Sequence, residues 1–168
     1  SITGWHTVDD NISRGDVDGG FGGIFAGVFP TGPGPGIPFD AQTADALADH
    51  KQYTQELRLA SNDWGRIDWQ AGFYYFHEDI DIDTFNYDSL FNVGAINGIT
   101  KQTQQTDSWA LFGTVNFDVT DRLNLQVGLR YSDDEKEFTA ERLLSPIGFG
   151  PAGPFSVNPT DENITGDI

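Results

Sequence analysis

The sequence contains no cysteine and no methionine among its 168 residues. Without cysteine the chain forms neither disulfides nor thiolate sites, although this absence assigns no compartment. A complete translation product starts with Met, whereas this chain starts within an alternating pattern, so we expect it to be part of a longer protein. No apolar run reaches the roughly 18 residues that a transmembrane helix needs, which leaves a helical membrane anchor without support in this sequence.

Basic residues are also scarce, because 9 Lys and Arg stand against 26 Asp and Glu, and the formal net charge is −17. A surface this acidic repels a phosphate backbone, which argues against nucleic-acid binding. High net charge is typical of disordered chains as well, but 13 Phe, 5 Tyr and 4 Trp supply apolar surface that such chains lack. The composition therefore predicts a folded, acidic protein with no nucleic-acid partner.

The ordered parts of the chain alternate between apolar and polar residues with the period of two that is typical of β-strands. We predict strands at about residues 1–8, 51–61, 66–78, 106–118 and 122–137. The segments between and after them are rich in Gly, Pro, Asp or Asn, and we predict long loops at residues 9–50, 79–104 and 138–168. The chain, residues 1–168, is thus predicted to be one all-β domain, an antiparallel up-and-down meander of about five strands with long loops.

Four aromatic residues occupy matching places in the two predicted hairpins. Tyr53 and Tyr75 are equally far from position 64, the middle of the first short turn, and Trp109 and Tyr131 are equally far from position 120. All four fall on the apolar face, so an antiparallel hairpin would bring each pair to one level. Rings at one height predict a membrane-interface girdle, and the roughly 8 to 10 residues between ring and turn are close to the length of a membrane-crossing strand.

The connections alternate between short turns and long loops along the chain, which is the layout of outer-membrane barrels. The strands "YTQELRLASNDWGRIDWQAGFYYFHED" and "DSWALFGTVNFDVTDRLNLQVGLRYSDDEKEF" resemble barrel segments of TonB-dependent receptors, and "SITGW" resembles the strand before them. The resemblance implies a transmembrane β-barrel of about 22 strands closed by a plug, located in the bacterial outer membrane. It also implies import of siderophores or other scarce nutrients, with membrane lipid and a TonB-type energy-coupling protein as partners. About five strands are too few to close such a barrel, so transport would belong to the parent chain.

An acidic run, "EDIDID", places Asp79, Asp81 and Asp83 on one side of an extended strand. Stacked carboxylates could bind Ca²⁺, a hard cation that takes oxygen ligands. The alternative is a strand end outside the cell that its charge keeps soluble. No other cofactor is expected from the sequence.

Catalytic and ligand-binding signals are weak. The three histidines, His6, His50 and His77, have no Glu or Cys partner at metal-binding spacing. No nucleophile elbow occurs and no carboxylate pair is marked by its setting, so the chain is not predicted to be an enzyme. Glu56, Arg58 and Arg130 are predicted to face the lumen of the barrel, but the sequence identifies no ligand-binding residues.

Two alternatives to a receptor segment remain open at this point. Released strands have unpaired edges and an uncovered apolar face, so the isolated chain could self-assemble, outside the cell, into a β-rich sheet or filament. A soluble β-sandwich binding module would instead require the two hairpins to pack their apolar faces together as a closed core.

Overall fold

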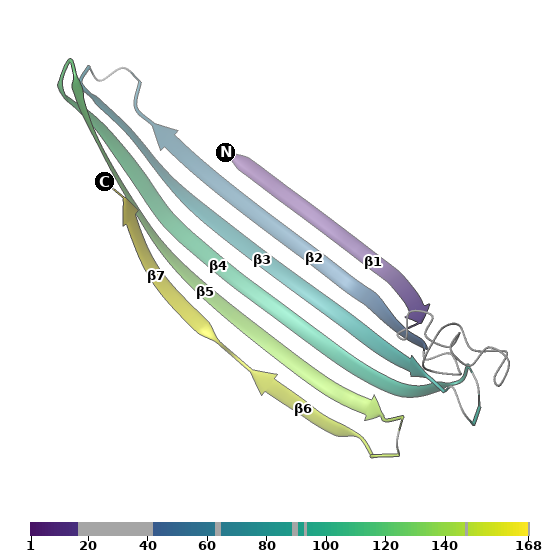
Figure 1. The fold of residues 1–168 in the computed structure, drawn as a ribbon. Helices are drawn as coiled ribbons and strands as arrows, with labels where there is room; N and C mark the ends of the chain where they lie inside the picture. The colour runs from purple at the N-terminus through teal and green to yellow at the C-terminus, as the bar shows by residue number, and fades with distance from the viewer. Residues whose placement is uncertain (17–41, 63–64, 89–90, 93, 147, 168) are drawn as a thin grey trace, which may run out of the picture.

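The computed structural model shows one curved antiparallel sheet (Figure 1) and describes residues 1–16, 42–62, 65–88, 91–92, 94–146 and 148–167. The strands are β1 (Ile2–Asp16), β2 (Gln42–Ala60), β3 (Ile67–Tyr87), β4 (Ile96–Thr120), β5 (Leu123–Leu144), β6 (Ala152–Val157) and β7 (Thr160–Asp167). Their order is β1-β2-β3-β4-β5-β6, with β7 also paired with β5. The predicted up-and-down meander is therefore confirmed, and the sheet is not closed. Within the described part of the chain, no helix is long and apolar enough to cross a membrane.

The strands are much longer than the sequence predicted. β3 has 21 residues and β4 has 25, so together they fill most of the predicted loop 79–104. The polar run "TKQTQQT" within β4 has no apolar face, and hydrophobic periodicity therefore gave no signal there, although each residue finds a partner on β3 and β5. In the predicted loop 9–50, residues 9–16 and 42–50 are likewise paired strand, and residues 17–41 lie outside the described part.

β6 and β7 are two halves of one interrupted strand. Both pair with β5 in one continuous register, given by the pairs Phe138–Val157 and Glu135–Thr160. Pro159 lies at the interruption, where it has no N–H to donate but accepts a hydrogen bond from the backbone of Lys136 at 3.0 Å. The predicted loop 138–168 is therefore wrong, because most of it belongs to β5, β6 and β7.

The connections still differ between the two ends of the sheet. Residues 61–66 and 121–122 join strands at one end, called here the short-turn end. At the other end the connections are residues 17–41, 88–95 and 145–151. The predicted long loops 79–104 and 138–168 are thus reduced to residues 88–95 and 145–151, which are little longer than the connection 61–66.

The sheet is a single layer, and no packed core forms among the described residues. Ala44 and Ala110 are the buried hydrophobic residues there. One surface, called here the apolar face, instead exposes large side chains toward the short-turn end: Leu57, Leu59, Ile67, Leu111, Val115, Phe117, Leu125, Val127, Leu129 and Ile164. Both hairpins contribute to this one face, and no second described layer covers it. The soluble β-sandwich alternative is therefore not supported.

Candidate functional site

A row of aromatic side chains crosses the apolar face from β1 to β5. Trp5 lies opposite Tyr53, and Tyr75 lies opposite Trp109. Ring centroids are 6.3 Å apart for Trp5 and Tyr53, 6.3 Å for Tyr53 and Tyr75, and 5.3 Å for Trp109 and Tyr131. The structure thus brings together the four aromatic residues singled out from the sequence and adds Trp5. Sequence reasoning missed Trp5 because the other rings were found by their equal distances from a short turn. No short turn joins β1 to β2, so that comparison could not be made for Trp5.

The aromatic row runs obliquely across the strands. Tyr75 faces Gln55 rather than Tyr53, and Tyr131 faces Leu111, so each of these rings lies two residues nearer the short-turn end. The prediction that Tyr53 faces Tyr75, and that Trp109 faces Tyr131, is therefore wrong: in each hairpin the two rings are offset by two residues along the strands. From β1 to β5 the row shifts by four residues, about 13 Å, over four strand spacings, about 19 Å, which inclines it by about 35° from the perpendicular to the strands.

Beyond the row, toward the longer connections, the same face becomes acidic. His77 Nδ1 lies 2.8 Å from Asp107 Oδ1, and its Nε2 lies 3.2 Å from Asp79 Oδ2. The Tyr75 hydroxyl donates to the same Asp107 oxygen at 2.9 Å. The hydrogen bond to Asp107, joined by the charges of Asp107 and Asp79, raises the pKa of His77 above its usual value. This cluster ties β3 to β4 directly beside the aromatic row.

The three aspartates predicted to bind Ca²⁺ occupy every second position of β3, so all three lie on this acidic part of the face. Asp79 contacts His77, and Asp83 Oδ2 lies 3.6 Å from Lys101 Nζ. Among the described residues, no group of three or more His, Asp or Glu side chains is arranged to hold a metal ion. The calcium hypothesis for Asp79, Asp81 and Asp83 therefore receives no geometric support.

On the opposite surface, called here the polar face, two arginines flank one aromatic ring. The Cζ atoms of Arg58 and Arg130 lie 5.9 and 6.0 Å from the Phe112 ring centroid. Arg58 also forms an ion pair with Glu56. Phe112 faces Gly72, where an added Cβ would lie 2.3 Å from the ring. Glycine at position 72 thus leaves room for the outer edge of the Phe112 ring, which lies between the two guanidinium groups.

The polar face also joins residues that are far apart in the sequence. His50 Nε2 lies 3.0 Å from Glu78 Oε1, and the His6 and His50 rings are 5.2 Å apart. The sequence placed no Glu or Cys at metal-binding spacing from the histidines, but in the structure His50 and His77 both contact carboxylates. Sequence spacing held no signal for the contacts of His50 with Glu78 and of His77 with Asp107, because each joins two neighbouring strands.

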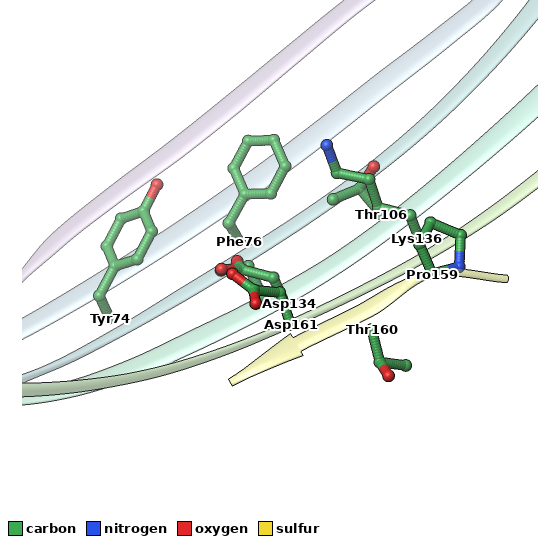
Figure 2. Close-up of a pocket in the computed structure, with 9 residues that line it drawn as sticks. Tyr74, Phe76, Thr106, Asp134, Lys136, Pro159, Thr160 and Asp161 are labelled. Atoms are coloured by element: carbon green, nitrogen blue, oxygen red, sulfur yellow. The ribbon is translucent and has the colours of Figure 1, made fainter. Parts of the chain in front are cut away.

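A cavity of about 520 Å³ opens on the polar face over β3, β4, β5 and β7 (Figure 2). Tyr74 and Phe76 project from β3 on one side of it, and Asp134 and Asp161 lie beside each other at its floor. The remaining lining residues are Thr106, Ser108, Lys136, Pro159 and Thr160. This volume lies within the range of small-molecule sites. Sequence reasoning named none of these residues, because the segment that carries Asp161 was predicted to be a loop.

Comparisons with known proteins agree with this geometry. A model of the family described as TonB dependent receptor-like, beta-barrel, matches residues 3–161. Among solved structures, the ferric yersiniabactin uptake receptor FyuA from Yersinia pestis is similar, with a TM-score of 0.60 and 17% sequence identity. The similarity covers 76% of this chain but 21% of that receptor, so this chain spans about a fifth of its length. Comparison with curated protein sequences gives no significant match. Because the family match spans nearly all of the sequence, this chain belongs to the TonB-dependent receptor family and forms part of its β-barrel.

Proposed function

We propose that this chain is a segment of the barrel wall of a TonB-dependent receptor in the bacterial outer membrane. The parent protein would import siderophores or other scarce nutrients, driven by a TonB-type energy-coupling protein. The proposal is for transport and involves no covalent chemistry. The observation that carries it is the oblique aromatic row, which borders the uncovered apolar surface on one side and an acidic surface on the other.

The inclination of the aromatic row supports a membrane boundary. Strands of outer-membrane barrels tilt by roughly 35 to 45° from the membrane normal. A row inclined by about 35° from the perpendicular to such strands lies in the membrane plane, where Tyr and Trp rings settle between lipid and water. From Leu123 to Tyr131, β5 supplies nine residues below this plane, close to the length that a tilted strand needs to cross the bilayer.

The same reasoning orients the rest of the sheet. β5 continues from Tyr131 to Leu144, which adds roughly 40 Å of wall beyond the aromatic row. This part would stand outside the membrane on the cell exterior, as the longer connections do in outer-membrane barrels. The polar face, with its cavity at the level of the aromatic row, would then line the lumen that the ligand enters.

Cysteine labelling tests this orientation, since the chain has no cysteine of its own. In intact cells that produce the full-length receptor, Glu135→Cys should react with a membrane-impermeant maleimide, because Glu135 lies beyond the aromatic row on the same face. Leu129→Cys, on the membrane side of the row, should be protected until the membrane is dissolved. Labelling of Leu129→Cys in intact cells at the rate of Glu135→Cys would rule out the proposed boundary.

A second candidate is self-assembly of the isolated chain. The observation that favours it is the pair of open strand edges, on β1 and on β6 with β7, beside an apolar face that no described layer covers. Sedimentation in water should show oligomers or filaments that detergent disperses. A stable monomer without detergent would eliminate this candidate.

A further inference from the structure

We infer that the cavity on the polar face binds a zwitterionic ligand of the short-peptide class, with an ammonium group at one end and a carboxylate at the other. This inference rests on the proposed function, because it takes the polar face to line the lumen of an importer. It goes further in naming the chemistry of the imported nutrient, which neither the family nor the similar receptor specifies for this chain.

The carboxylates on the cavity floor are arranged to receive a positive charge. Asp134 and Asp161 face each other directly on β5 and β7, where side chains stand about 5 Å apart at their Cβ atoms. Like charges at such positions repel. Among the described residues, neither carboxylate forms an ion pair or a side-chain hydrogen bond. A ligand ammonium between them would relieve this repulsion and donate a charge-assisted hydrogen bond to each.

The cavity also has a positively charged residue beside the two carboxylates. Lys136 lies two residues from Asp134 on the same strand face, so their Cα atoms are about 7 Å apart. No ion pair joins its ammonium to any carboxylate in the described part of the chain. An extended dipeptide spans at most about 7 Å between its ends. One such molecule could therefore place its amine at the aspartates and its carboxylate at Lys136.

The β3 wall of the cavity, level with Asp134 and beside it, suits an apolar side chain. Tyr74 and Phe76 lie on one face of β3 and expose their rings to the cavity (Figure 2). Aromatic rings bury large apolar surface and pack well against another ring. The hydroxyls of Thr106 and Ser108 border the same space and can hydrogen-bond a peptide backbone.

Other ligand classes fit the cavity less well. An anionic metal chelate would be attracted by Lys136 but repelled by both aspartates. A simple cation would gain the aspartates but would leave Lys136 unpaired and close by. A neutral ligand would form no ion pair with any of the three charged side chains. Of these classes, a ligand that carries both charges can pair with all three groups.

Calorimetry of the full-length receptor in detergent micelles tests the inference with the dipeptide Gly-Phe as the probe. N-acetyl-Gly-Phe lacks the ammonium and Gly-Phe-amide lacks the carboxylate, so each should bind at least about tenfold more weakly than Gly-Phe. Lys136→Gln should weaken Gly-Phe but not its amide. Asp161→Asn, with Asp134→Asn as a second variant, should weaken Gly-Phe but not its N-acetyl form.

Glu162→Gln is the matched control, because it removes the same charge from the neighbouring residue on the opposite face of β7. It should leave the affinity for Gly-Phe unchanged, and circular dichroism should show all variants equally folded. Absence of Gly-Phe binding at millimolar concentration, or equal binding of the three probes, overturns the inference. Tight, Lys136-dependent binding of ferric citrate in place of Gly-Phe also overturns it. The proposed function would stand in each case, since the labelling of Leu129→Cys tests it separately.

Discussion

The rings of Tyr53 and Tyr75 lie 6.3 Å apart between centroids, although Tyr75 stands opposite Gln55 in the sheet. The contact is diagonal, and diagonal neighbours in an antiparallel pair are still within reach of aromatic side chains. Trp109 and Tyr131 repeat this geometry one hairpin later. The repetition in two hairpins keeps the aromatic row at a constant inclination, as a flat membrane boundary across tilted strands requires.

The apolar face below the aromatic row should not tolerate charge. Val127→Arg places a guanidinium near the middle of the proposed lipid-facing band and should lower the free energy of unfolding of the full-length receptor by about 2 to 4 kcal/mol. Gln126→Arg, the adjacent residue on the polar face, should change it by less than about 0.5 kcal/mol. Guanidinium titration in lipid vesicles, followed by tryptophan fluorescence, measures both. Equal costs at the two positions would contradict a lipid-facing apolar face.

Gly72 should be replaceable only if the facing ring is removed. In Gly72→Ala the new Cβ overlaps the Phe112 ring, so we expect a loss of about 1 to 3 kcal/mol in the free energy of unfolding. Gly113→Ala, whose Cβ would meet Gln70 O at 3.4 Å, is the milder control. A double-mutant cycle with Phe112→Leu should show that the cost of Gly72→Ala largely disappears. Additive effects would mean that the ring does not pack on Gly72.

The contact of His77 with Asp107 and Asp79 should weaken as the pH rises. Because the folded-state pKa of His77 is raised, its contribution to stability is complete below the unfolded-state pKa of about 6.5 and is lost as the pH passes through the higher folded-state value. His77→Gln should therefore destabilise the receptor more at pH 5.5 than at pH 9. Chemical denaturation at the two pH values gives the comparison, and an NMR titration of the His77 ring gives the pKa itself. A mutational effect independent of pH would argue against a charged His77.

β7 should be the least stable strand, because all eight of its residues are exposed and it pairs with β5 along one edge only. On the apolar face Asp133 faces Glu162, a second pair of like charges. Glu162→Lys converts this pair into an attractive one and should slow amide hydrogen exchange in β7 by about two- to fivefold. The effect should shrink at high salt. Unchanged exchange at low salt would show that the pair does not affect the docking of β7.

Much of the barrel wall could be predicted from the sequence. The alternation in Leu57, Leu111, Val127 and their neighbours specified strands with one apolar face, because successive residues of a strand point to opposite sides. The aromatic residues Tyr53, Tyr75, Trp109 and Tyr131 were recognisable for the same reason. Where both faces are polar, as in "TKQTQQT", the pattern disappears although the strand continues, since backbone pairing with its neighbours is enough to extend it.

The sequence by itself thus determined the amphipathic parts of five strands, the apolar face and the resemblance to a barrel family, because these depend on local periodicity and on local motifs. Only the tertiary structure decided the register, and with it the two-residue offset of the aromatic row, since a turn can place its symmetry centre at either of two neighbouring residues. It alone also set Asp161 opposite Asp134 and the Phe112 ring on Gly72. Such contacts join residues from different strands, and pairing between strands, rather than the order of residues along any one of them, brings them together.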